Sequence, residues 1–69
     1  MKNSIKVERA KANLTQDDLA KLIHVSRQTI NAIEKGKFNP STILALKIAK
    51  VFSVGVNDIF FLEETDLEE

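Results

Sequence analysis

The sequence predicts an all-α domain built from five short helices. Three observations lead to this prediction. Apolar residues recur at helical steps of three and four, residues typical of helix caps and helix ends separate the apolar stretches, and no Val/Ile/Thr alternation is long enough for a strand. A chain of 69 residues with no cysteine and one histidine is expected to rest on apolar packing, because it offers neither a disulfide frame nor a zinc cluster.

The first two predicted helices lie before residue 24. One runs from about Ser4 to Asn13, with Ser4 itself or Asn3 as its N-cap. The next begins at Thr15 and runs to about residue 23, because Thr15 followed three residues later by Asp18 resembles a capping box.

The third predicted helix begins after Ser26 and ends at about Lys35. Ser26 has a hydroxyl that can cap the first turn. Gly36 is expected to end the helix, because glycine adopts the positive φ at which a chain commonly leaves a helix. Residues 37–40 then form a loop.

The fourth predicted helix opens with Pro40, Ser41 and Thr42. Its apolar residues repeat at helical spacing and form the clearest core stripe of the chain: Leu44, Ala45, Ile48, Ala49 and Phe52. A short fifth helix is expected from about Val56 or Asn57 to Phe61, with Ile59 and Phe60 inside the core.

The second and third helices, joined by a tight turn, have the layout of a helix-turn-helix that reads DNA. At about 100° per residue, Arg27, Gln28, Asn31 and Lys35 fall on one side of the third helix, and Ile30 and Ile33 fall on the other. One side is therefore expected to pack while the opposite side presents hydrogen-bond donors. The remaining apolar positions of the motif are Leu14, Leu19, Ala20, Ile23 and Val25.

Charge divides the chain into two parts. Residues 1–50 hold all ten basic residues and four acids, a net +6, whereas the last nineteen residues hold six acids and no base. A basic body with an acidic end suits a nucleic-acid binder that directs its tail away from phosphates, although a solvated, frayed terminus explains the tail equally well. We expect one domain at 1–62 and an acidic tail at 63–69.

Composition argues against several classes of protein. The chain has no Gly-rich phosphate loop and no evident pair of catalytic carboxylates, so we expect no enzyme, cofactor, metal or small-molecule ligand. It contains no long apolar run, so we expect no membrane association. The expected location is cytoplasmic.

The segment LTQDDLAKLIHVSRQTINAIEKGKFNPS resembles the Cro and lambda-repressor-like helix-turn-helix domains, also called xenobiotic-response-element regulators. The resemblance extends from Ile5 to Phe61. It implies the five-helix lambda-repressor-like fold and a transcriptional regulator, here expected to be a repressor that binds a pseudo-palindromic operator through the major groove as a homodimer. The alternative is an antitoxin-like module that neutralises a partner through its acidic tail and binds DNA secondarily.

The chain departs from this family at the turn between the second and third helices. Most relatives have Gly there, and this chain has His24. We interpret His24 as a turn residue at positive φ, not as a ligand or an acid/base group, because His tolerates that region better than β-branched residues do.

The third helix supplies the candidate base contacts. Arg pairs with guanine O6 and N7, and Asn or Gln pairs with adenine N6 and N7, so Arg27, Gln28 and Asn31 form a suitable set. The resemblance implies that their side chains point at base edges and that Ala32 lies near the groove floor. The alternative is an ordinary solvated helix face.

The candidate phosphate contacts lie at helix ends, where backbone N–H groups and flexible cations can meet an anion. Gln16 matches the phosphate-binding Gln of the family. Thr29 could contact a phosphate or stand between helices. The others flank the exit of the third helix: Lys35, Lys37 and Asn39.

The resemblance further implies that Arg9 and Glu34 form a structural ion pair between the first and third helices. Three base-reading side chains at about 1 to 3 kcal/mol each supply too little discrimination for a monomer, which favours a dimer. The candidate interface consists of apolar residues beyond what the core needs: Ile43, Leu46, Val51, Phe61 and Leu62.

Overall fold

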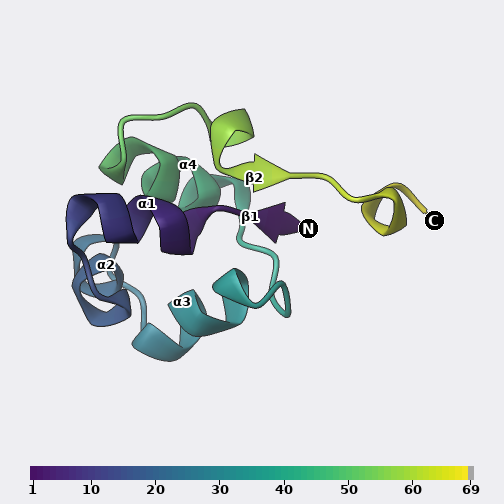
Figure 1. The fold of residues 1–69 in the computed structure, drawn as a ribbon. Helices are drawn as coiled ribbons and strands as arrows, with labels where there is room; N and C mark the ends of the chain where they lie inside the picture. Colours follow the sequence, from purple (N-terminus) through teal and green to yellow (C-terminus); the bar gives the residue numbers. More distant parts are fainter. Residues whose placement is uncertain (69) are drawn as a thin grey trace.

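Four α-helices surround the core, and both ends of the chain meet in a small sheet (Figure 1). The computed structural model describes residues 1–68. The helices are α1 (Ile5–Ala12), α2 (Gln16–Leu22), α3 (Arg27–Glu34) and α4 (Thr42–Val51). The strands are β1 (Lys2–Asn3) and β2 (Phe60–Phe61), and two 3-10 turns are η1 (Val56–Asp58) and η2 (Glu64–Leu67).

Side-chain caps begin three of the helices where the sequence predicts them. Thr15 and Asp18 form the expected capping box: Asp18 N donates to Thr15 Oγ1 over 3.0 Å, and Thr15 N donates to Asp18 Oδ2 over 2.9 Å. Ser26 Oγ accepts from Thr29 N, and Ser41 Oγ accepts from the backbone N–H three residues on. Each cap satisfies a backbone N–H that has no partner within the helix.

Two predicted backbone conformations are confirmed. Gly36 follows α3 with φ 73°, and His24, in the turn between α2 and α3, has φ 59°. Asn13 and Ser53 also adopt positive φ, at 58° and 55°. Asn13 caps the C-terminal end of α1 in the left-handed conformation, which Asn tolerates better than most residues do.

The core lies between the four helices and the segment that follows η1. Its fully buried large side chains come from every α-helix and from the segment after η1: Ile5, Leu19, Ile30, Ile33, Ile48 and Ile59. Ile59 and Phe60 are inside, as the sequence predicts. Within the predicted stripe of α4, Ile48 and Ala49 are buried, and its other members pack against the core while keeping some exposure.

The predicted fifth helix and the predicted absence of strands are wrong. After the short turn η1 the chain becomes extended, and β2 pairs antiparallel with β1, with Lys2 opposite Phe61 and Asn3 opposite Phe60. Aromatic residues favour strands, but two-residue strands are too short for alternation to reveal them. The partner strand, moreover, comes from the other end of the chain.

The acidic C-terminal segment lies beside the N-terminus (Figure 1). The amine of Met1 is 3.1 Å from Asp66 Oδ1 and 3.5 Å from Glu63 Oε1. We call this pair of contacts the terminal clasp. Glu69, the last residue of the predicted tail, lies outside the described residues.

Candidate nucleic-acid interface

The outer face of α3 carries a polar surface opposite the core. Ile30 and Ile33 are fully buried, whereas Arg27 and Gln28 are exposed on the other side of the same helix. Asn31, half-buried, and Lys35, exposed, complete a shallow hollow lined by these four polar residues. The helix thus packs through one face and presents donors and acceptors on the other, as its periodicity predicts.

Gln16 fixes the start of α2 against α3. Its side-chain amide donates to Asn31 Oδ1 over 3.3 Å and to Glu34 Oε1 over 3.2 Å. Asn31 Oδ1 retains a second lone pair, and its amide N–H groups remain available as donors. The bond therefore orients Asn31 while leaving it able to pair with a base edge.

An ion pair anchors the C-terminal half of α3. Arg9 Nε is 2.7 Å from Glu34 Oε2, a second guanidinium N–H donates to Glu34 Oε1, and a third donates to the backbone oxygen of Leu14. The side chains are only 13% and 7% exposed. The hydrogen bond to Glu34 raises the pKa of Arg9.

The segment that leaves α3 presents three of the predicted phosphate contacts. Lys35, Lys37 and Asn39 are all exposed, and the positive-φ residue Gly36 turns the chain between the two lysines. Thr29 lies differently: its hydroxyl is 2.9 Å from Ser26 Oγ at the start of the helix, within the N-terminal cap. Ala32 is half-buried.

Asn3 connects β1 to α3, a role that sequence reasoning missed. Its Nδ2 donates to the backbone oxygen of Ile33 over 2.8 Å, and its Oδ1 accepts from Ile5 N over 3.2 Å. The second contact agrees with the sequence, which offers Ser4 or Asn3 as the cap of the first helix; the Ser4 side chain makes no cap bond. The first joins residues far apart in sequence and leaves no local signal.

The apolar residues predicted to form a dimer interface are mostly exposed. Ile43 and Leu62 are 69% and 68% exposed, and Leu46 and Phe61 are 53% and 43% exposed. Val51 is half-buried. Sequence reasoning did not single out Leu22 and Leu67, which are 56% and 69% exposed.

Residues 1–68 contain no group of three His, Cys, Asp or Glu side chains placed to hold a metal ion. None of the helices in this range combines the length and the apolarity needed to cross a bilayer.

Comparison with known proteins agrees with this geometry. The family model described as Helix-turn-helix matches residues 5–59. An uncharacterized HTH-type transcriptional regulator of Methanocaldococcus jannaschii is 61% identical over 66 residues, which cover 96% of this chain and 100% of the relative. The HTH-type regulator YgzD of Bacillus subtilis is 50% identical over 64 residues, covering 93% of this chain and 97% of the relative.

A solved structure is also similar. The restriction-modification controller protein C.AhdI from Aeromonas hydrophila superposes with a TM-score of 0.74 at 27% sequence identity, over 81% of this chain and 85% of that one. The fold, the match over most of the chain and these relatives together place the protein among transcriptional regulators, a non-enzymatic DNA-binding class. The chain belongs to the Cro/lambda-repressor-like helix-turn-helix family of the xenobiotic-response-element type.

Proposed function

We propose that this protein is a repressor that binds a pseudo-palindromic operator as a homodimer, with α3 of each subunit in the major groove. The observation that carries the proposal is the outer face of α3, where Arg27, Gln28 and Asn31 line one hollow opposite two fully buried isoleucines. A helix anchored in this way can enter a groove without losing core contacts.

Base readout rests on the first two turns of α3. Arg27 can donate to guanine O6 and N7, and Gln28 and Asn31 can each pair with adenine N6 and N7. The orientation of Asn31 by Gln16 supports its assignment, because a fixed amide loses less rotamer entropy on binding. The half-buried methyl of Ala32 is proposed to contact a thymine methyl.

Phosphate contacts set the register of α3 in the groove without reading sequence. Lys35, Lys37 and Asn39 are exposed where the chain leaves α3. Gln16 and Thr29 stand in the first turns of α2 and α3, where the helix dipole favours an anion. We assign the backbone contacts to these five residues.

The dimer is proposed to form through apolar residues of α4, of β2 and of the position after β2. Four of them are exposed, Ile43, Leu46, Phe61 and Leu62, and Val51 is half-buried. A symmetric pair doubles the number of bases read and covers apolar surface that is costly to leave in water. A regulator of this kind works at the nucleoid.

Selection of bound sites from random duplex DNA tests the proposed operator. We expect a pseudo-palindrome with half-sites about one helical turn apart. An Arg27→Ala protein should keep its thermal melt and lose discrimination at one position of each half-site. The matched control is Lys11→Ala, which removes a cation of α1 that pairs with Glu8 and should leave the selected sequence unchanged.

Three results would contradict parts of this proposal. Recovery of a single asymmetric half-site by a monomeric protein would contradict the proposed dimer. Unchanged sequence preference in Arg27→Ala would remove the readout assignment. If the protein increases transcription from a reporter whose promoter overlaps the selected site, its assignment as a repressor is wrong.

A further inference from the structure

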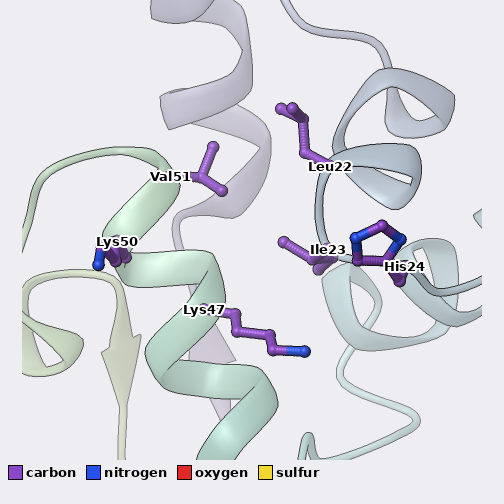
Figure 2. A pocket seen from close by; sticks show the side chains of 6 residues that line it. All are labelled: Leu22, Ile23, His24, Lys47, Lys50 and Val51. Carbon is purple, nitrogen blue, oxygen red and sulfur yellow. The ribbon is translucent and has the colours of Figure 1, made fainter.

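We propose that a groove between the C-terminal end of α2 and α4 binds the acidic segment, residues 63–68, of a second copy of this chain. Figure 2 shows the groove, which is lined by Leu22, Ile23, His24, Lys47, Lys50 and Val51 and which we call the α2–α4 groove. None of these residues lines the hollow on the outer face of α3. The groove therefore lies apart from the proposed base-reading surface, and it shares Val51 with the proposed dimer interface.

The walls of the groove are apolar and its rim is basic. Leu22 and Val51 stand on opposite walls (Figure 2), and Leu22 is 56% exposed. Lys47 extends from the α4 wall toward the turn that holds His24. Neither Lys47 nor Lys50 has an ion-pair partner within residues 1–68. The occupant should therefore combine an apolar side chain with carboxylates.

The acidic segment has this composition, because it combines an exposed leucine with exposed carboxylates. Leu67 is 69% exposed, and Glu64 and Glu68 are exposed without an ion-pair partner in the described part of the chain. Residues three apart in a 3-10 turn eclipse each other, so η2 puts Glu64 and Leu67 on the same side. A Leu beside a carboxylate complements an apolar groove that has lysines along its α4 wall.

The terminal clasp prepares the segment for docking. Asp66 and Glu63 contact the Met1 amine, and Asp66 Oδ2 also accepts from Glu63 N over 2.8 Å. These contacts use Glu63 and Asp66, so the carboxylates of Glu64 and Glu68 remain for docking. Ordering the segment before binding reduces the conformational entropy lost on association.

The occupant must come from another molecule. The acidic segment of each chain is held at the end of the molecule beside its own N-terminus, whereas the groove lies at the α2 end (Figure 1). The contact joins the acidic segment of one copy to the α2–α4 groove of another. It uses Leu22 and Leu67, two exposed leucines that the proposed operator complex leaves unexplained.

Titration of the full-length ¹⁵N-labelled protein with a peptide of residues 63–68, blocked at both ends, tests the groove directly. We expect amide shifts that saturate and that concentrate at Leu22, His24, Lys47 and Lys50. The same peptide with Leu67→Ser should bind at least fivefold more weakly, because it loses the apolar contact. Shifts confined to other surfaces, or equal binding of both peptides, would overturn the proposal.

Zero-length carbodiimide cross-linking of the full chain tests the contact between copies. In a mixture of ¹⁴N and ¹⁵N protein, we expect mixed-isotope cross-links between Glu64 or Glu68 and Lys47 or Lys50. Lys47→Glu with Lys50→Glu should abolish every mixed-isotope cross-link of Glu64 and Glu68, those to other lysines included. The matched control, Lys11→Glu with Lys21→Glu, changes the charge equally at surface pairs outside the groove and should retain them.

Charge exchange completes the test. Mixing the Lys47→Glu, Lys50→Glu protein with a Glu64→Lys, Glu68→Lys protein should restore mixed-isotope cross-links between the same positions. Failure of this rescue in folded proteins would overturn the proposal. So would displacement of the peptide from the groove by duplex DNA, which would assign the two lysines to phosphates.

Discussion

His24 shows how one backbone conformation constrains the side chain. It occupies the left-handed region at φ 59° between α2 and α3, and its side chain is exposed at the edge of the α2–α4 groove. The left-handed conformation costs about 1–2 kcal/mol for an ordinary L-residue, and more for a β-branched one. The residue at this position is therefore restricted by its backbone conformation and not by the chemistry of an imidazole.

We expect His24→Val to lower the free energy of unfolding by about 1–2 kcal/mol, because a β-branched residue fits the left-handed region poorly. His24→Gly is the control. It relieves backbone strain but gains freedom in the unfolded chain, so the stability should change by less than about 1 kcal/mol. Urea denaturation measures both variants. Equal stability of the two would show that φ does not constrain this position.

Arg9 acts in folding, whereas Arg27 is proposed to act in recognition. We expect Arg9→Ala to lower the free energy of unfolding by about 3 kcal/mol, because it leaves Glu34 as a mostly buried charge without its cation. Arg27→Ala, at an exposed position, should change stability by no more than about 0.5 kcal/mol. Thermal or urea denaturation of the two proteins, side by side, checks the difference.

Among the elements, the two-residue strand β1 connects three others, β2, α3 and α1. It pairs with β2, and through Asn3 it also holds the last turn of α3 and the first turn of α1. The strand therefore links the C-terminal segment of the domain to the helix that faces the proposed operator. This link uses one side chain and a ladder of two residue pairs.

Asn3→Ala should lower the free energy of unfolding by about 1–2 kcal/mol, because two hydrogen bonds that join separate elements are lost. Amide hydrogen exchange should become faster at the C-terminal turn of α3 and stay unchanged in α2. Lys2→Ala, on the same strand but exposed, should leave both measurements unchanged. Uniformly faster exchange in all helices would argue against a local link.

For the whole molecule, the terminal clasp makes the position of the acidic segment depend on pH. The hydrogen bond to Asp66 raises the pKa of the Met1 amine above its ordinary 8.0. The pKa of Asp66 lies below its ordinary 3.8, first because of the Glu63 backbone N–H and then because of the amine. The amine contributes stability below pH 8.0 that is lost as pH rises through its raised pKa.

The carboxyl behaves in the opposite sense. Its contribution is present above pH 3.8 and is lost as pH falls through its lowered pKa. The clasp should therefore hold between the lowered pKa of Asp66 and the raised pKa of the Met1 amine, and it should open at lower or higher pH. NMR shifts of Asp66 and Phe61 measured against pH check this. A chain acetylated at its N-terminus should lose the alkaline transition, and an unchanged alkaline transition would contradict the role of the amine.

The parts of the fold that could be predicted from the sequence are those that depend on neighbouring residues. The capping box at Thr15, the caps at Ser26 and Ser41, and the stop at Gly36 each depend on residues within three or four positions, so they could be read directly. The region after Val56 could not. Its aromatic residues suit a buried helix as well as a short strand, and only pairing with β1 decides between them.

The candidate interface divides in the same way. Periodicity alone placed Arg27 and Gln28 opposite Ile30 and Ile33, because a helix fixes the angle between its own residues. The contacts of Asn3 with Ile33, and of Met1 with Asp66, exist only because the folded chain closes large loops. Such closures depend on the packing of the whole core and have no signature in any short window of sequence.

The sequence by itself thus determined the four helices, the caps at Thr15, Ser26 and Ser41, and the polar face of α3, since all of these follow from steric and hydrogen-bonding preferences within one or two helical turns. The tertiary structure alone decided that the two ends of the chain pair as β1 and β2, that Asn3 holds α3, and that a basic-rimmed groove opens between α2 and α4. These features place residues from distant segments side by side, and that proximity arises only when the shared core forms.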